Sequence, residues 1–266
     1  MKLGFIGTGN MASAIMGGII SKGMIDADQI IGADVSEAGR TRVEKEYGIH
    51  VTTDNKEVIK VADKVILSVK PQFYPTVIQE VKDCIRENQI VITIAPGKTL
   101  EWLEEQFGKP VKLIRTMPNT PAMVGEGMTA VCANSYVTEG ELEEVLQMLG
   151  AFGKTEVISE HLMDVVVSTS GSSPAYIFML IEAMADAAVA DGMARAQAYK
   201  FAAQAVLGSA KMVLETGIHP GELKDMVCSP GGTTIEAVAA LEENGFRNAI
   251  IKAMKVCEEK SKEMSK

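Results

Sequence analysis

The sequence predicts an α/β domain with a parallel-rich sheet, followed by an all-α domain. Short β-branched runs alternate with helix-period segments up to about residue 155, and a glycine loop at Gly7-Thr8-Gly9 follows the first run. From about residue 160 the strand-like runs stop, and Ala, Met and Leu dominate. Alternating strands and helices favour a parallel sheet covered on both faces. We therefore expect one domain over residues 1–158 and a second, all-helical domain over residues 159–266.

The elements follow from these patterns in chain order. Runs that are apolar for most of their length predict strands at Leu3–Ile6, Gln29–Ala33, Lys64–Val69, Gln89–Ile94 and Val111–Thr116. Helical periodicity separates them, for example at Asn10–Ser21, Glu37–Tyr47 and Pro75–Ile85. The second half predicts helices at Met163–Thr169, Ala175–Gly192, Ala196–Thr216, Gly221–Val227 and Thr233–Gly245.

The predicted helix from Ala175 to Ala190 is apolar on nearly every side. A helix with so little polar face must be buried all round, and a helical half of about a hundred residues has limited room to bury it. We infer that a partner subunit covers part of it, giving a homodimer through the C-terminal helices, with a larger homo-oligomer as an open alternative. A helix central to its own bundle is the other reading. Glu182 and Asp186 argue against a membrane span.

Composition narrows the partners and the location. The formal net charge of −9 disfavours nucleic acid and anionic membrane surfaces as partners, whereas a small-molecule substrate needs only local donors. The four cysteines are far apart, which favours reduced, mostly buried thiols over disulfides or a metal site. The first residues run directly into the glycine loop without the pattern of a signal peptide. We expect a cytoplasmic protein without a metal.

The segment from Gly4 to Ala12 has the Gly-x-Gly-x-x-Ala pattern of a dinucleotide-binding loop. Gly7 permits the tight turn, Gly9 lets the backbone approach a pyrophosphate, and Ala12 lets the helix lie close to the strand. The pattern stands at the start of an alternating strand–helix domain, which is the context that it requires. A glycine turn without a ligand is the competing interpretation.

The end of the second predicted strand leaves the choice of cofactor open. Asp34 can bind a ribose 2′-hydroxyl, which favours NAD, whereas Ser36, Arg40 and Arg42 can hold a 2′-phosphate, which favours NADP. Each of these residues can equally be a solvated surface residue. We expect NADP(H), with NAD(H) as the alternative.

Three further segments have unusual composition. Ser68-Val69-Lys70-Pro71 and Met117-Pro118-Asn119-Thr120-Pro121 each follow a strand, at the sheet edge where such folds bind ligands. In the third, a Ser-Pro-Gly-Gly turn at residues 229–232 precedes a helix start at Thr233-Thr234, whose free N–H groups can bind an anion. A helix–helix turn with a threonine cap is the simpler interpretation.

His50, His161 and His219 form no recognisable acid–base arrangement.

With these segments in hand, the chain resembles the pyrroline-5-carboxylate reductases over essentially its whole length. The resemblance rests on Gly4–Met11, Val69–Pro71, Met117–Pro121, Ser170–Tyr176 and the string from His219 to Glu242. It implies a Rossmann-like N-terminal domain and a helical domain that interlocks with a second subunit. Two departures from the family pattern are Ser173, in place of a commoner Gly, and Pro96, in place of a frequent Ala.

The resemblance also implies site residues. Together with Asp34 and Ser36 from the strand-end pattern, the expected cofactor contacts are Ile6, Gly7, Thr8, Gly9, Asn10, Met11, Asn55, Ser68, Val69, Lys70, Pro71 and Ala95. The expected substrate positions are Ser229, Gly231, Gly232, Thr233 and Thr234, with Thr234 as the catalytic hydroxyl that hydrogen-bonds the ring nitrogen. The resemblance further implies that a neighbouring chain can complete the substrate site.

The implied reaction is hydride transfer from NAD(P)H to the C=N carbon of 1-pyrroline-5-carboxylate, giving L-proline in the last step of proline biosynthesis. An imine is easily protonated, which explains why no strong general base is needed. The β-hydroxyacid dehydrogenases resemble one another in a catalytic lysine, but here the segment after Gly171 has no lysine until Lys200. A reductase of another cyclic imine and a non-catalytic NAD(P)H sensor are further alternatives.

Overall fold

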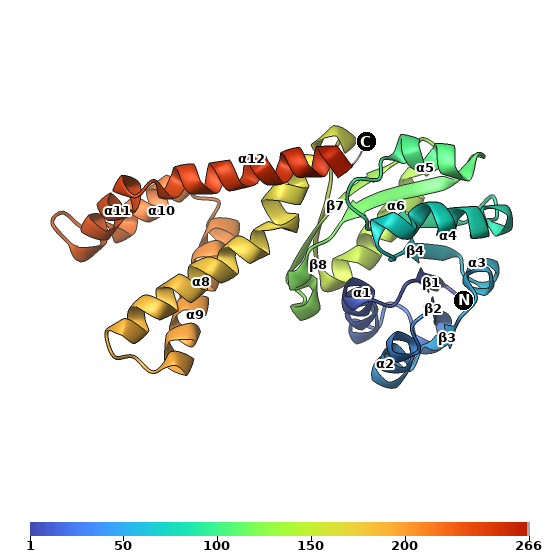
Figure 1. The fold of residues 1–266 in the computed structure, drawn as a ribbon, viewed down its shortest axis with the longest axis horizontal. Coiled ribbons are helices and arrows are strands. Elements are labelled where there is room, and N and C mark those ends of the chain that lie inside the picture. Colours follow the sequence, from blue (N-terminus) through green and yellow to red (C-terminus); the bar gives the residue numbers. More distant parts are fainter. Residues whose placement is uncertain (265–266) are drawn as a thin grey trace. The chain divides into compact units, whose positions relative to one another are not determined.

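The computed structural model describes residues 1–264, which form two compact units. One unit comprises Met1–Ser172 together with the chain from Cys257 onward, and the other comprises Ser173–Val256 (Figure 1). The last helix therefore begins in the second unit and ends in the first. The domain boundary after residue 158 marks where the strand pattern stops, and it stays a prediction.

The first unit is built on one sheet, which has eight strands in the described chain, in the order β3-β2-β1-β4-β5-β6-β7-β8. Neighbouring strands are parallel except β6 and β7, which pair antiparallel. The predicted parallel-rich sheet is confirmed. The strands are β1 Leu3–Ile6, β2 Ile30–Ala33, β3 His50–Thr52, β4 Lys64–Leu67, β5 Ile90–Thr93, β6 Lys112–Met117, β7 Gly127–Ala133 and β8 Gly153–Val157.

Helices cover both faces of this sheet and bury two apolar clusters. Residues of α1 (Asn10–Ser21), α2 (Glu37–Tyr47) and α6 (Glu139–Leu149) contribute to the cluster on one face. Residues of α3 (Asn55–Val61), α4 (Tyr74–Val81) and α5 (Leu100–Phe107) contribute to the other. The near-continuous apolar strands are thus explained, since a strand covered on both faces has no solvated side.

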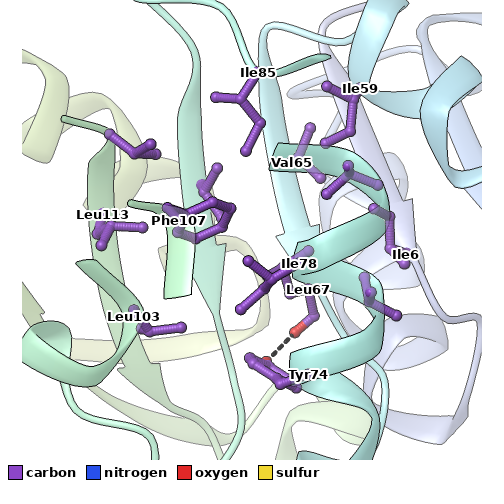
Figure 2. Packing of buried hydrophobic residues seen from close by; sticks show 14 of the residues in the cluster. Ile6, Ile59, Val65, Leu67, Tyr74, Ile78, Ile85, Leu103, Phe107 and Leu113 are labelled. Carbon is purple, nitrogen blue, oxygen red and sulfur yellow. Dashed lines mark hydrogen bonds between the residues drawn. The ribbon is translucent and has the colours of Figure 1, made fainter. Parts of the chain in front are cut away.

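Tyr74 lies within the second of these clusters and brings one polar atom into it. Its hydroxyl donates to the backbone oxygen of Leu67 at 2.6 Å, at the end of β4 (Figure 2). Burial raises the pKa of Tyr74 far above its usual value, so the hydroxyl stays protonated and remains a donor. The bond fixes the start of α4 against the end of β4, just before Ser68.

The second unit is entirely helical over its described residues. Its helices are α8 Ser173–Ala190, α9 Arg195–Thr216, α10 Pro220–Val227, α11 Thr233–Glu243 and the first part of α12 Phe246–Met264. The helix α7 Met163–Val166 and a π-helical turn, η7, at Val167–Gly171 precede them and belong to the first unit. α8 and α9 pack side by side as a helical hairpin through small buried residues, Ala185, Ala198 and Ala202 (Figure 1).

In the single chain the helix predicted at 175–190 is not buried all round, which leaves an apolar surface for the partner subunit inferred from the sequence. Ala185 is the one buried residue recorded on α8, whereas Phe178 is 63% and Met179 is 69% exposed. α9 covers only one side of α8, so the alternative of a helix central to its own bundle does not hold for the described residues.

By length and composition alone the helical stretch Glu160–Ala190 could cross a membrane, which is weak evidence because buried helices of other proteins share these properties.

Candidate cofactor and substrate site

The carboxyl ends of the central strands bring the predicted cofactor residues to one edge of the sheet. Ile6 at the end of β1 is paired with Ala33 of β2 on one side and with Leu67 of β4 on the other. Gly7, Asp34 and Ser68 follow these three residues and are therefore neighbours. Ser68 donates its hydroxyl to the backbone oxygens of Ile6 and Gly7, at 3.1 and 2.7 Å.

The glycine loop has the geometry that its motif predicts. Gly7 has φ = +101°, and a Cβ there would lie 2.8 Å from the backbone carbonyl of Ser68. A Cβ on Gly9 would project into open space, with nothing within 4 Å. α1 starts directly after Gly9 without a side-chain cap. Its first N–H groups are thus available, and an anion such as a pyrophosphate fits them.

Asp34 and Arg42 both contact Thr8 in the middle of this loop. Oδ2 of Asp34 accepts from the backbone N–H of Thr8 at 2.7 Å and from its hydroxyl at 3.0 Å. Nη2 of Arg42 donates to the backbone oxygen of Thr8 at 2.6 Å. The structure thus gives both charges partners within the protein, in addition to any cofactor.

The other predicted cofactor positions are divided between exposed and buried places. Ser36 is the exposed N-cap of α2 and accepts from the N–H of Gly39 at 3.2 Å. Asn55 begins α3 and donates to Glu80 at 2.9 Å. Lys70 is exposed, and Ala95 is buried just beyond β5. These positions all belong to the sheet-based unit.

The predicted substrate residues form a tight turn in the helical unit. Gly231 has φ = +66°, and a Cβ on Gly232 would lie 2.3 Å from the hydroxyl oxygen of Ser229. The N–H of Gly232 donates to the backbone oxygen of Ser229 at 3.0 Å. α11 begins at Thr233 without a side-chain cap, so its N-terminal N–H groups can receive an anion. The segment is a helix–helix turn, as the simpler interpretation has it, but its N-cap is Gly232 and not a threonine.

Relatives of the chain identify its family. A pyrroline-5-carboxylate reductase of Escherichia coli (strain K12) is 53% identical over 265 residues, which cover 100% of this chain and 98% of the relative. One of Methanosarcina acetivorans is 44% identical with the same coverage. The chain belongs to the pyrroline-5-carboxylate reductase family. Family models agree: residues 160–264 match pyrroline-5-carboxylate reductase dimerisation, and residues 2–97 match NADP oxidoreductase, coenzyme F420-dependent.

Solved structures of pyrroline-5-carboxylate reductases have the same fold. The Plasmodium falciparum enzyme, solved with NADP bound, superposes with a TM-score of 0.92 at 31% identity and covers 100% of this chain and 98% of its own. The Coxiella burnetii enzyme gives a TM-score of 0.91 at 36% identity, with the same coverage. A 3-hydroxyisobutyrate dehydrogenase of Mycobacterium tuberculosis shares the fold alone, with a TM-score of 0.53 at 14% identity.

Two buried polar residues, Asn119 and Arg115, have structural roles that were not predicted from the sequence. Asn119 is buried and donates to the backbone oxygen of Ser170 in η7 at 3.0 Å, while its Oδ1 accepts from the N–H of Met128 at 2.9 Å. Both polar atoms of the Asn119 side chain thus have partners within the protein. Arg115 of β6 pairs with Glu160 at 2.8 Å. A polar residue inside an apolar strand run was the available signal.

The histidines and cysteines among the described residues form no cluster that points to a catalytic or metal site. His219 caps α10, where its Nδ1 accepts from the N–H of Gly221 at 3.1 Å. No group of three or more His, Cys, Asp or Glu in residues 1–264 is arranged to hold a metal ion. The four cysteines are free; Cys132 is buried, and Cys84, Cys228 and Cys257 are half-buried in the single chain.

Proposed function

We propose that this chain reduces the C=N bond of 1-pyrroline-5-carboxylate to give L-proline, with NADP(H) as the preferred cofactor. One observation carries the proposal: this chain, which is 53% identical to a pyrroline-5-carboxylate reductase, has two uncapped helix starts, at α1 and at α11. The first suits a pyrophosphate and the second suits a small carboxylate. The nicotinamide, when bound, supplies the hydride.

The protein's own contribution is mainly to bind and orient the substrate. The N–H groups at the start of α11 bind the carboxylate, and this local attraction outweighs the formal net charge of −9. The hydroxyl of Thr234 hydrogen-bonds the ring nitrogen. A hydroxyl is too weak an acid to be the whole proton source, so water or the protonated imine supplies the proton. Orientation then provides most of the acceleration.

The proposed site residues are divided between the two units. The proposed substrate residues are Ser229, Gly231, Gly232, Thr233 and Thr234. The cofactor is bound by the loop from Ile6 to Met11, next to Asp34, and by the positions Ser36, Asn55, Ser68, Val69, Lys70, Pro71 and Ala95. The chain acts in the cytoplasm as a homodimer through the C-terminal helices. The exposed apolar surface of α8 and the dimerisation family match support this association.

Thr234 provides the direct test of the substrate assignment. Thr234→Ala should lower kcat/KM for the imine by roughly ten- to a hundredfold, the loss expected for one hydrogen bond to a charged group. Cofactor affinity should stay near that of the parent protein. Thr234→Ser keeps the hydroxyl and should retain most of the activity of the parent protein. Unchanged kcat/KM in Thr234→Ala would show that the assigned role is wrong.

The cofactor preference is tested by following NADPH and NADH absorbance with pyrroline-5-carboxylate added. We expect the higher kcat/KM with NADPH because Ser36 and Arg40 stand at the start of α2, where a 2′-phosphate meets both donors and the helix N-terminus. Arg40→Ala should reduce the preference by raising KM for NADPH more than KM for NADH. A parent enzyme that prefers NADH would overturn this choice.

A further inference from the structure

Thr8 is the one non-glycine residue of the Gly7-Thr8-Gly9 loop, and the protein holds it on both sides. Its side chain is buried, with only 1% of the residue exposed. Asp34 accepts from its N–H at 2.7 Å and from its hydroxyl at 3.0 Å, while Arg42 donates to its backbone oxygen at 2.6 Å. Opposite charges thus bind the two peptide groups that flank one residue.

The remaining hydrogen-bonding capacity of both charges is also directed to the protein. Oδ1 of Asp34 accepts from the N–H of Ser36 at 2.9 Å. The guanidinium of Arg42 also donates to Oδ1 of Asn10 at 3.2 Å and to the hydroxyl of Ser13 at 3.1 Å. Three of the roughly four acceptor positions of the Asp34 carboxylate are therefore occupied before any ribose arrives. Arg42 likewise ties the first turn of α1 to α2.

We propose that Asp34 and Arg42 are positioning residues that hold the glycine loop in the shape that receives the pyrophosphate, and that Asp34 does not select NADH. The inference rests on the proposed function for its cofactor. Glycines at both sides of Thr8 leave the loop backbone little intrinsic preference for one shape. Charged partners on Thr8 supply that preference, so their loss weakens binding of the part of the cofactor that NADH and NADPH share.

The experiment compares Asp34→Asn with Asp28→Asn, a matched loss of charge at an exposed position before β2. The side chain of Asn has an NH₂ group in place of one carboxylate oxygen, so it faces one of the groups that donate to Asp34 with a second donor. We expect faster amide hydrogen exchange in the segment 7–13 of the unliganded protein, without a comparable change in Asp28→Asn. We also expect Kd for NADPH and Kd for NADH to rise by the same factor, about tenfold.

Arg42 gives a second variant with its own control. Arg42→Gln should accelerate exchange in the same segment and raise both Kd values together, whereas Lys45→Gln on the same helix should do neither. Arg42→Lys keeps the charge but has no guanidinium fork to span three acceptors. Its Kd values for both cofactors should lie between those of the parent protein and those of Arg42→Gln.

Two results would overturn the assignment. A rise in Kd for NADH alone, or a gain in NADPH affinity, in Asp34→Asn would make Asp34 a ribose-reading residue. Unchanged exchange in segment 7–13 in both Asp34→Asn and Arg42→Gln would show that these residues do not hold the loop. Failure of the proposed function is a separate outcome, because a parent protein that binds neither cofactor still gives the exchange result.

Discussion

At the scale of single residues, polar groups in apolar surroundings carry much of the specific structure. Arg115 lies inside the sheet with 5% of its side chain exposed, and it pairs with Glu160 at 2.8 Å. Oε1 of Glu160 also accepts from the N–H of Leu100 at 2.7 Å. Burial, with the Glu160 charge, raises the pKa of the neighbouring Cys132 to about 12, so that thiol stays neutral. Glu160 is thus the counter-charge of Arg115.

Removing that counter-charge should destabilise the protein. Glu160→Gln leaves a buried guanidinium without its carboxylate, and we expect the free energy of unfolding to fall by about 3 kcal/mol. Urea denaturation measures the change. The double variant Arg115→Met with Glu160→Gln should recover stability because it removes the unpaired charge. A single variant as stable as the parent would contradict the assigned pairing.

Residue-level chemistry of the site could be predicted only in part from the sequence. The Gly-x-Gly spacing predicted Gly7 and its tight turn, because φ = +101° excludes other residues there. The contacts of Asp34 with Thr8 could not be predicted, since they depend on β1 and β2 being neighbours in register. The same limit applies to Asn119, which joins segments that are far apart in the chain.

At the scale of elements, the sequence predicted helices and strands where the apolar periodicity is strong and missed them where it is weak. The predicted helices Asn10–Ser21 and Glu37–Tyr47 match α1 and α2 to the residue. β3, β7 and β8 escaped prediction because β3 has three residues, β7 contains one Gly and two Ala, which have low strand propensity, and β8 is a polar edge strand. α12 was missed as well, since its many charged residues obscure its apolar positions.

The π-helical turn η7 depends on an element that is distant in the chain. Asn119→Ala removes a donor from the backbone oxygen of Ser170 and an acceptor from the N–H of Met128. Each unsatisfied buried group costs about 1–3 kcal/mol, so the free energy of unfolding should fall by at least about 2 kcal/mol. Urea denaturation checks this, with the exposed Asn88→Ala as control. Equal stability of the two variants would argue against this role of Asn119.

At the scale of the whole molecule, the exposed apolar face of α8 predicts association. Phe178→Glu places a charge on that face, where 63% of Phe178 is exposed in the single chain, and should shift a homodimer towards monomer. Sedimentation velocity measures the shift. The control Tyr136→Glu adds the same charge at an exposed position in the sheet-based unit and should leave the mass unchanged. An unaltered dimer in Phe178→Glu would place the interface elsewhere.

The path of α12 has a consequence for how the chain matures during synthesis. Ser261 donates to Asp164 at 2.5 Å, and the backbone of Met264 packs against Gly97, so the sheet-based unit is completed by residues that follow the whole helical unit in the chain. Every residue of the helical unit leaves the ribosome before that closure. The nascent chain must therefore hold an unfinished first unit while its apolar helices emerge.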